Sequence, residues 1–391
     1  MRVIGADPYT LYDKKTGYYY VYSTSNEGKD KTFYIHRSKD LINFEFVNYA
    51  LDLTKNNWAK DWHWAPECYY NEKTGLYFLF YSARVKDELL MKYFEESEFE
   101  EGTRIGCAVS KSPTGPFINI ENRPIDFNPY DPNFLDIYPL IKNDLSASIS
   151  YEKALKEAKV GTFISTIDAN LYFENDRIYL YFSRCCYKHY TFDKEFNKFI
   201  EESNILCAEL DRSFFDDPEG KTNPSVKKEY KDFYGKNKDK AVEILTYELD
   251  PQPWENGHVN DFILTNGKKK NRRWLEGSTT IKTKINGEDT YTLFYSANNY
   301  ENSLYGVGLA FAKSPLGPFK KYKNNPLIHK IDGILYSTGH GGVTYLNNDL
   351  YYVFHARKQE TDERSIYSCK INIEDFDNIR VSNIQEGILV D

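Results

Sequence analysis

The sequence lacks the features that mark membrane proteins and nucleic-acid-binding proteins. No apolar run approaches the about 18 residues that a membrane-spanning helix needs, so no membrane span is expected. The formal net charge is −8, and no basic stripe is interleaved with aromatic residues, which argues against a nucleic-acid partner. We therefore expect neither a membrane nor nucleic acid as a partner.

Signatures of metal sites and disulfide frameworks are also missing. The six cysteines show no C-x-x-C spacing, and several fall within apolar runs, so we expect reduced thiols in the core. There is no H-E-x-x-H motif, so a transition-metal site is not expected. The first residues lead directly into an expected strand, with no signal peptide before it. The expected location is the cytoplasm. Secretion is the alternative, if the natural protein has a signal peptide that this sequence does not include.

Aromatic residues, in contrast, are abundant: they make up 16% of the chain and include 34 tyrosines. They concentrate in five runs that are typical of β-strands, because aromatic and β-branched residues bounded by turn residues favour that structure. The runs are residues 18–23, 77–82, 179–183, 291–296 and 351–356. Each is followed by a second apolar run, at 33–39, 105–111, 205–210, 307–313 and 366–371. Self-similarity at such long intervals indicates a repeat architecture.

The spacing of the aromatic runs predicts a five-bladed β-propeller. Two pairs of neighbouring runs start 59 and 60 residues apart, which suits a blade of about 40–50 residues plus a loop. We therefore expect an all-β fold with helical or loop insertions, forming a single propeller domain over residues 1–391. A string of β-hairpins in two stacked sheets is the alternative that aromatic runs alone do not exclude.

One polar residue precedes the end of each aromatic run by 15 to 20 positions. If the aromatic run is the second strand of a blade, this polar residue lies on the first strand, which lines the central channel. The five residues are Asp7, Glu67, Asp168, Glu276 and His340. We expect their side chains to converge near the axis of the propeller.

Three of these residues, Asp7, Asp168 and Glu276, carry carboxylates that suit acid–base chemistry. Carboxylates held together in aromatic surroundings raise one another's pKa. Enzymes use such an arrangement to keep one carboxyl protonated while another stays ionised. Cleavage of a glycosidic bond needs that pair, because one acid protonates the leaving oxygen while one carboxylate activates water or attacks the sugar.

The sequence around these positions resembles glycoside hydrolase family 43, a group of five-bladed β-xylosidases, α-L-arabinofuranosidases and arabinanases. That family has Asp-Pro near its start, Trp-Ala-Pro-Asp/Glu in blade two, Ile-Asp in blade three, a Glu-Gly-Pro-like element in blade four and Gly-His in blade five. The elements here, in the same order, are Ala6-Asp7-Pro8, Trp64-Ala65-Pro66-Glu67, Ile167-Asp168, Glu276-Gly277 and Gly339-His340. Ser278 and Ala169 stand where the family usually has Pro, but neither departure removes a carboxylate.

The resemblance implies an inverting glycosidase that cleaves pentose-containing plant polysaccharides or oligosaccharides. Asp7 would be the general base, Glu276 the general acid, and Asp168 the residue that orients the acid and holds its pKa up. Inversion implies that the carboxyl groups of Asp7 and Glu276 stand about 6.5–9.5 Å apart. No cofactor is required, but a histidine at the position of His340 commonly lies near calcium or a water cluster in this family. A structural calcium held through waters is therefore a further expectation.

Residues just before Glu67 are expected to bind the substrate. Trp62 and Trp64 have faces that stack on sugar rings, although they would equally fill the propeller core. Glu67 itself would bind sugar hydroxyls or form an ion pair inside the channel. These alternatives remain open at the level of the sequence.

Three further residues complete the expected substrate site. Trp274 lies two positions before Glu276, and so faces the same side of a strand. His340 is expected at the axis, where a hydrogen-bonded structural histidine is the alternative. Arg357 follows the fifth aromatic run and would reach a substrate hydroxyl, although a surface salt bridge is the simpler explanation for it.

Three segments between the blades carry none of these motifs. Residues 85–103 are rich in acidic side chains and predict a short helix with a solvated face. Residues 143–160 include helix formers from 150 to 160, and residues 211–240 predict a loop excursion rich in Lys and Asp. Any of the three would be placed to rim a site or an oligomer contact.

Two other functions would keep this fold. A non-catalytic carbohydrate-binding propeller would be free to lose a carboxylate, yet all three are present. A glycoside phosphorylase would need cationic side chains placed for phosphate, and no clear cluster of them accompanies the carboxylates in the motifs. The sequence leaves open the linkage that is cleaved, exo or endo action, and the oligomeric state.

Overall fold

Each aromatic run forms the second strand of an antiparallel sheet in the computed structural model, which describes residues 1–27, 32–94, 97–125, 164–193, 198–227, 242–247, 249–260 and 269–390. Blade one contains β1 (Ala6–Asp13), β2 (Tyr18–Thr24), β3 (Tyr34–Ser38) and β4 (Asn43–Tyr49). Blade two contains β5 (Ala59–Asn71), β6 (Leu76–Val85), β7 (Thr103–Ser110) and β8 (Ile118–Asn119). Blade three contains β9 (Ile164–Glu174), β10 (Arg177–Asp193), β11 (Lys198–Leu210) and β12 (Val242–Leu245). Blade four contains β14 (Lys269–Ile285), β15 (Glu288–Ala297), β16 (Gly306–Ala312) and β17 (Lys320–Lys321), and blade five contains β18 (Thr338–Leu346), β19 (Asp349–Ala356), β20 (Ser365–Ile373) and β21 (Ile379–Glu386).

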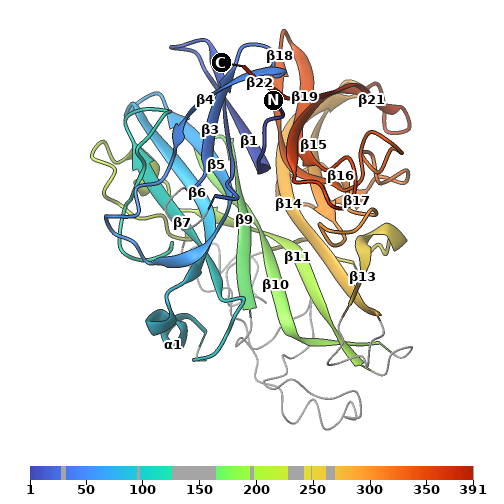
Figure 1. Cartoon of the computed structure of the whole chain (residues 1–391), viewed down its shortest axis with the longest axis horizontal. Helices are drawn as coiled ribbons and strands as arrows, with labels where there is room; N and C mark the ends of the chain where they lie inside the picture. The colour runs from blue at the N-terminus through green and yellow to red at the C-terminus, as the bar shows by residue number, and fades with distance from the viewer. Residues whose placement is uncertain are drawn as a thin grey trace.

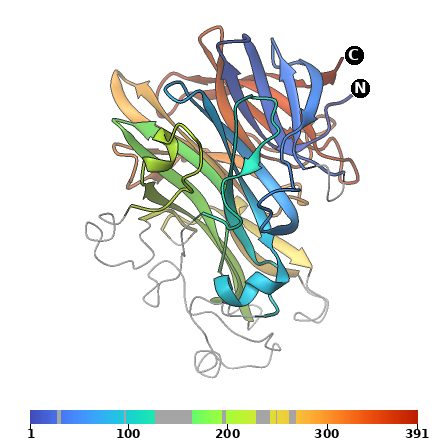
Figure 2. The same ribbon diagram turned by 90° about the vertical axis from the view of Figure 1, so that its left-hand side faces the viewer.

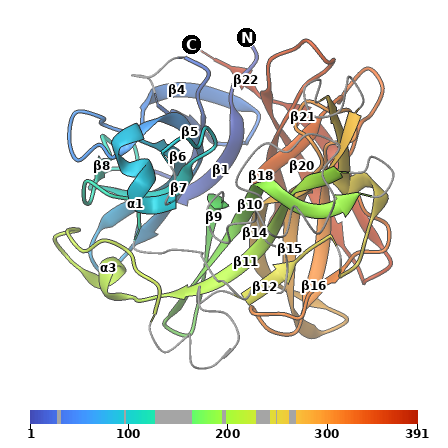
Figure 3. The same ribbon diagram turned by 90° about the horizontal axis from the view of Figure 1, so that it is seen from below.

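The first strands of the five blades stand in a closed ring. β1 lies against β5, β5 against β9, β9 against β14, β14 against β18, and β18 against β1. Figure 3 shows these strands near the middle of the molecule, with the outer strands β4, β8, β16 and β21 further out. The predicted five-bladed β-propeller is therefore confirmed.

The two ends of the chain close this ring within blade one. A final short strand, β22 (Ile388–Leu389), pairs in parallel with β4. The backbone N–H of Leu389 donates to the carbonyl of Met1, and Arg2 forms a β-bridge with Ile388. The N- and C-terminal ends lie side by side in both Figure 1 and Figure 2. Blade one thus holds the beginning and the end of the chain together.

The hydrophobic core is divided among the seams between neighbouring blades, and the aromatic runs serve two seams at once. On β6, Tyr77, Leu79 and Tyr81 pack toward blade one, while Phe78 and Phe80 pack toward blade three. Successive side chains of a strand point to opposite faces, so a strand between two blades is buried on both. This explains why the runs are apolar at nearly every position, and why tyrosine serves mainly as a packing residue.

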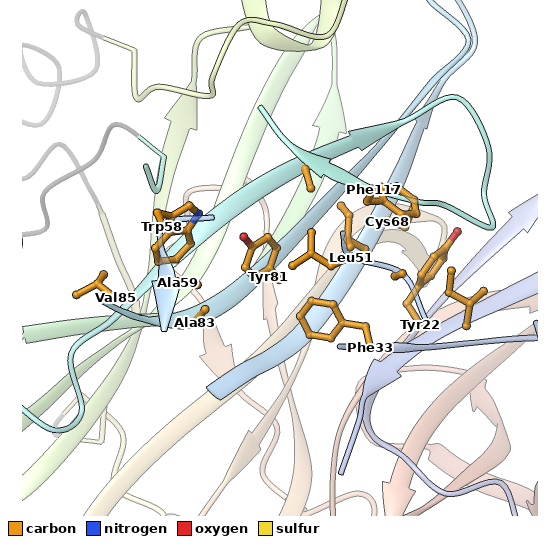
Figure 4. Packing of buried hydrophobic residues seen from close by; sticks show 14 of the residues in the cluster. Tyr22, Phe33, Leu51, Trp58, Ala59, Cys68, Tyr81, Ala83, Val85 and Phe117 are labelled. Carbon is orange, nitrogen blue, oxygen red and sulfur yellow. The ribbon is translucent and has the colours of Figure 1, made fainter. Parts of the chain in front are cut away.

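Figure 4 shows the seam between blades one and two. Tyr22 and Phe33 from blade one meet Tyr81 and Cys68 from blade two, with Trp58 beyond them. All five of these side chains are almost fully buried. Every cysteine side chain that the structure describes is likewise buried, in agreement with the expectation of core thiols.

Blades three and four are additionally joined by backbone pairing. Residues 201–203 of β11 pair in parallel with residues 272–274 of β14, and β13 (Asn256–Asn260) pairs with the first half of β14. The hydroxyl of Ser203 also donates to the carbonyl of Leu275 at 2.8 Å. These strands extend together at the bottom of Figure 1. The seam fixes the part of β14 that comes directly before Glu276.

The insertions are only partly described. Residues 85–103 contain the short helices η1 (Asp87–Leu89) and α1 (Leu90–Phe94), as predicted for this segment. Two further short helices are α3 (Ser213–Asp216) and η2 (Pro253–Glu255). The predicted helix at 150–160, the whole 143–160 segment and residues 228–240 of the predicted excursion lie outside the described residues. Across the described ranges, no helix has the length and apolar character needed to cross a membrane.

Candidate active site

A β-bulge interrupts the first strand of every blade at the level of the predicted site. In blade one the register between β1 and β2 shifts between Ala6 and Tyr9, so that Asp7 and Pro8 face a single residue of β2. Corresponding shifts occur in β5, β9, β14 and β18. Bulges of this kind re-aim a side chain and are common beside active sites.

The bulges allow the blades to be compared residue by residue. The first bulged residue is Asp7 in blade one, Asp168 in blade three and His340 in blade five, while Ala65 and Gly277 stand at the same place in blades two and four. Asp7 and Asp168 have φ angles of 50° and 59°, in the left-handed region that residues other than glycine seldom adopt. The bulge therefore gives both aspartates the same unusual backbone.

The two glutamates do not share this position. Glu276 stands one residue before the bulge of β14, and Glu67 stands two residues after the first bulged residue of β5. Glu67 and Glu276 therefore do not stand at the bulge position that Asp7, Asp168 and His340 share. In blade four the bulge position that holds Asp7 and Asp168 in blades one and three is occupied by Gly277. A Cβ added to Gly277 would lie 2.5 Å from the ring of His340. Glycine at this point leaves room for the histidine.

The backbone N–H of the bulged residue is held by the preceding blade in three cases. The N–H of Ala65 donates to Oγ1 of Thr24 at 2.9 Å, that of Asp168 to Oγ of Ser82 at 2.8 Å, and that of Asp7 to Nδ1 of His355 at 3.0 Å. The acceptors occupy the same position in their blades, since each pairs with the residue directly before the bulge of its own first strand. A polar side chain on the second strand of one blade thus holds the backbone of the bulge in the next blade.

These bulges open onto one cavity of about 390 Å³. The residues that line it are Asp7, Trp62, Trp64, Ile167, Asp168, Trp274, Glu276, Asn298, Asn299, Tyr300, Tyr305, His340 and Arg364. Seven of the predicted site residues are among them, including all three carboxylates proposed for catalysis. Glu67 and Arg357 are not.

Asp7 is surrounded by groups that favour its charged form. Burial by itself raises the pKa of Asp7, but its contact with His355 and the charge of Arg364 hold it well below its ordinary range. The hydroxyl of Thr24 donates to Oδ2 at 2.8 Å, and Arg364 lies 3.8 Å from Oδ1. Asp7 is therefore an ionised carboxylate at neutral pH.

Asp168 lies in a contrasting environment. Burial, and then the charges of Glu276 and Asp7, raise its pKa well above the ordinary value. The backbone N–H of Gly277 donates to its Oδ2 at 3.0 Å and opposes that rise. His340 places Nδ1 at 3.6 Å from Oδ1 of Asp7 and 3.7 Å from Oδ2 of Asp168, so its ring lies between the two carboxylates. Burial lowers the pKa of His340, which favours the neutral imidazole.

Glu276 is held at both oxygens. The indole N–H of Trp274 donates to Oε2 at 2.5 Å, and the hydroxyl of Tyr305 donates to Oε1 at 2.7 Å. Trp274 packs against Ile167 and Cys185 and is almost fully buried. The carboxyl group is consequently fixed in orientation at the wall of the cavity.

An aromatic stack forms another part of the wall. The rings of Trp62 and Trp64 are stacked with centroids 5.0 Å apart and an interplanar angle of 15°. The guanidinium of Arg84 lies 4.1 Å from the Trp62 ring centre, and it makes two hydrogen bonds to Asp61 at 2.6 and 2.7 Å. Trp62 and Trp64 thus line the pocket, as one of the two alternatives predicted, and Arg84 contacts the Trp62 ring.

Glu67 lies outside the residues that line the cavity. Its carboxyl accepts hydrogen bonds from the hydroxyl of Tyr69 and from Nδ2 of Asn170, the latter at 3.0 Å. It is buried, and this burial raises its pKa to about 8. Glu67 therefore links blades two and three inside the channel through a phenol and an amide, and not through the ion pair that was one of the two expectations.

Arg357 is likewise placed away from the cavity. Its guanidinium donates to the backbone carbonyl of Asp362 at 2.6 Å. The arginine that lines the cavity is Arg364, which precedes β20 and stacks against Tyr300, with 5.0 Å from its guanidinium to the ring centre. Sequence reasoning chose the wrong arginine because Arg357 adjoins a recognisable strand, whereas Arg364 reaches the cavity from a loop.

Sequence reasoning also missed Tyr305, His355 and the Asn298–Asn299–Tyr300 segment that follows the fourth aromatic run. The only signal was the position of His355, which stands where other blades end their aromatic run with Ser or Thr. Loop residues such as Tyr305 carry no periodic signal, because their contacts depend on how neighbouring blades pack.

The described residues do not fit direct coordination of a metal ion. Within the described ranges, no group of three or more His, Cys, Asp or Glu side chains is arranged to hold one. Calcium takes about 6–8 oxygen ligands, whereas His340 offers a ring nitrogen that faces two carboxylates. A calcium held through waters stays a prediction, and no step below depends on a metal.

The geometry of three carboxylates in one propeller pocket agrees with the comparison to known families. Residues 1–146 and 169–374 match the sequence model of glycosyl hydrolases family 43. The chain belongs to this family. It is therefore an inverting O-glycosyl hydrolase, and the predicted family and enzyme class are confirmed. Among curated proteins, none matches the chain by sequence.

Solved structures support the same assignment for this family 43 enzyme. A thermostable family-43 glycoside hydrolase shares 25% identity with a TM-score of 0.64, over 100% of this chain and 96% of that one. The endo-1,4-β-xylanase from Bacteroides thetaiotaomicron shares 26% identity with a TM-score of 0.62, over 100% and 98%. The α-L-arabinofuranosidase from Lactobacillus brevis shares 16% identity with a TM-score of 0.55, over 95% and 91%, and so shares the fold.

Proposed function

We propose that this family 43 glycosidase hydrolyses pentosidic bonds of plant oligo- or polysaccharides, with Asp7 as general base, Glu276 as general acid and Asp168 as the carboxylate that orients and tunes the acid. The observation that carries the proposal is that one cavity holds three carboxylates in three different environments. An inverting glycosidase needs an ionised base and a proton donor at the same time. Different surroundings are the means of keeping two carboxyl groups in opposite protonation states.

Asp7 suits the part of the base. Its contacts with Arg364 and His355 favour the carboxylate, so it is ready to accept a proton from water. Removal of that proton allows the water oxygen to form a new bond to the anomeric carbon. The attack takes place on the face opposite the leaving oxygen, which inverts the anomeric centre.

Glu276 suits the part of the acid. Its carboxyl is fixed by Trp274 and Tyr305 at the edge of the cavity, and Asp168 lies near enough for their charges to interact. Transfer of its proton to the glycosidic oxygen lets the bond between that oxygen and the anomeric carbon break. The proton that Asp7 gains and the proton that Glu276 gives up balance over the cycle, and exchange with solvent restores both groups.

Asp168 suits a supporting part. Its Oδ2 accepts the N–H of Gly277, the residue directly after Glu276, so it anchors the backbone of the acid. The charge of Glu276 raises the pKa of Asp168, so the two carboxyl groups interact electrostatically as well as through the backbone. His340 places Nδ1 between Asp7 and Asp168, at 3.6 and 3.7 Å from an oxygen of each carboxylate.

The substrate class rests on the family and on the aromatic wall. The stacked Trp62 and Trp64 offer flat apolar faces of the kind on which sugar rings stack. One of the two most similar structures above is described as an endo-1,4-β-xylanase, so the β-xylosidic linkage is the first to test. α-L-Arabinofuranosides and arabinan come next, because enzymes acting on them share the fold.

Hydrolysis assays on aryl β-xyloside, aryl α-L-arabinofuranoside, xylan and arabinan test the proposal. Wild type should turn over at least one, and Glu276→Ala should lose most of that activity. Equal rates for the two proteins would remove the acid assignment. An NMR time course should show the inverted anomer first, and a retained anomer would remove Asp7 as the base that activates water.

A further inference from the structure

We propose that Tyr305 is a positioning residue for the reaction, which holds the Glu276 carboxyl in place and reverses its own hydrogen bond when that carboxyl carries the proton. The hydroxyl of Tyr305 donates to Oε1 of Glu276 at 2.7 Å inside the cavity. No sequence motif points to this residue. The inference rests on the proposed role of Glu276 as the acid.

The surroundings of Tyr305 fix both its backbone and its ring. Its carbonyl accepts the backbone N–H of Thr338 at 3.1 Å and the hydroxyl of the same residue at 3.2 Å, which ties the loop to the first strand of blade five. Its ring lies over Gly339, where an added Cβ would stand 2.0 Å from the ring, and stacks on His355 with centroids 6.0 Å apart. A tyrosine that is 1% exposed and packed in this way has one orientation available for its hydroxyl oxygen.

The two partners of Glu276 differ in what they can do. The indole N–H of Trp274 only donates, so it supports Oε2 as an acceptor in either protonation state. A phenol donates or accepts, so Tyr305 can stabilise the carboxylate by donating, and can turn its proton away and accept when Oε1 is protonated. Burial raises the pKa of Tyr305, which keeps the phenol in its neutral form across the working range. Tyr305 is thus the partner suited to both states of the acid.

Tyr305 also lies between the acid and the base. Its hydroxyl contacts Glu276, and its ring packs on the imidazole that accepts the backbone N–H of Asp7. The two catalytic groups are consequently positioned against a common side chain. A phenylalanine at this place would keep the packing over Gly339 and His355 and remove only the hydrogen bond.

The test compares Tyr305→Phe with wild type, Glu276→Ala and a matched control. Tyr295 is also buried in blade four and donates to a buried carboxyl, Oε1 of Glu255, at 2.7 Å, but lies outside the cavity. Tyr295→Phe therefore removes a similar hydrogen bond at a distance from the reaction. For each protein, kcat and KM are measured on a phenyl glycoside, which needs a proton on the leaving oxygen, and on a dinitrophenyl glycoside, which does not.

Tyr305→Phe is expected to lower kcat roughly tenfold on the phenyl glycoside, with little change on the dinitrophenyl glycoside and little change in KM. It should also move the alkaline limb of the pH profile toward higher pH, because the charged form of Glu276 loses a donor. The other groups facing this pair are Asp7 from β1, Asp168 from β9, His340 from β18, His355 from β19 and Arg364 before β20. None of them is altered in the variant. Tyr295→Phe should leave both readouts unchanged.

The outcomes separate this proposal from the assignment of the acid. If Glu276→Ala loses activity equally on both glycosides, the acid assignment fails and the role of Tyr305 fails with it. If Glu276→Ala is selective for the phenyl glycoside but Tyr305→Phe is not, only the role of Tyr305 fails. A pH profile of Tyr305→Phe that coincides with wild type, or a matching shift in Tyr295→Phe, would also overturn the role of Tyr305.

Discussion

The Nδ1 atom of His355 in blade five accepts the backbone N–H of Asp7 in blade one at a distance of 3.0 Å. The contact spans 348 residues of sequence and holds a backbone that has a φ of 50°. Burial lowers the pKa of His355 to about 4, so the imidazole is neutral and Nδ1 is free to act as an acceptor near neutral pH. The position of the proposed base is therefore set by the last blade of the chain.

Replacement of His355 tests this relationship. His355→Leu should lower kcat by roughly tenfold or more, because a buried N–H left without an acceptor costs about 1–3 kcal/mol. His355→Asn should recover part of the loss, since its amide oxygen can take the place of Nδ1. Steady-state kinetics on an aryl pentoside measures both, with thermal unfolding as the check on folding. Equal activity for the two variants would show that the acceptor does not matter.

Arg364 is expected to set the acidic limb of the pH profile. Its guanidinium lies 3.8 Å from Oδ1 of Asp7 and lowers the pKa of that carboxyl. Arg364→Met should therefore raise the pKa of Asp7 and move the acidic limb of kcat/KM to higher pH. Arg357→Met, whose parent side chain bonds the Asp362 carbonyl outside the cavity, should move it less. Equal shifts in the two variants would contradict a direct effect of Arg364 on Asp7.

Glu67 is expected to govern stability more than activity. Its pKa in the folded protein is about 8, above the ordinary value of 4.5, so the fold favours the protonated form. This contribution is fully present below about pH 4.5 and is lost as the pH rises through about 8. Glu67→Gln should therefore lose less stability than wild type between pH 5 and pH 8, by on the order of 1–3 kcal/mol.

Denaturant unfolding at several pH values measures that difference, and kinetics on the same variant tests the position of Glu67 outside the cavity. Activity should stay within about tenfold of wild type, because the amide keeps the shape of the carboxyl. A loss as deep as that of Glu276→Ala would show that Glu67 takes part in the reaction after all.

Trp62 is expected to contribute to binding of the sugar. Trp62→Ala removes one face of the aromatic wall, and should raise KM by roughly tenfold with a smaller change in kcat, since stacking on an aromatic ring is worth about 1 kcal/mol or more. Arg84→Met leaves the indole in place but removes the cation that contacts its ring, and should have a weaker effect in the same direction. A fall in kcat without a change in KM would instead place Trp62 among the groups that act on the transition state.

Much of the fold could be predicted because it depends on local patterns. The second strand of each blade is buried on both faces, so it must be apolar along its length, and that requirement is visible as the aromatic runs. The polar residue upstream of each run marked the first strand of each blade. It thereby identified Asp7, Asp168 and His340, which share the bulge position around the channel. The same pattern carried the family resemblance.

The details of the site could not be predicted because they depend on one-residue shifts and on loops. Side chains of a strand alternate between its faces, so a bulge of one residue decides which of them enters the channel. The position of the bulge put Glu276 at the wall of the cavity and left Glu67 outside its lining, buried against Tyr69 and Asn170. Only the packing of blades five and one brought His355 to Asp7.

The sequence by itself determined the five-bladed fold and the family, and it singled out three carboxylates that the structure places in one cavity. Periodic burial and the motifs around the carboxylates are local features of the sequence, so they could be recognised without the structure. The tertiary structure alone decided which further residues serve them: Arg364 in place of Arg357, and Tyr305 and His355, which no motif marks. The physical reason is that these residues act across the seams between blades. A contact of that kind depends on the relative position of two sheets, which the sequence pattern of either sheet does not predict.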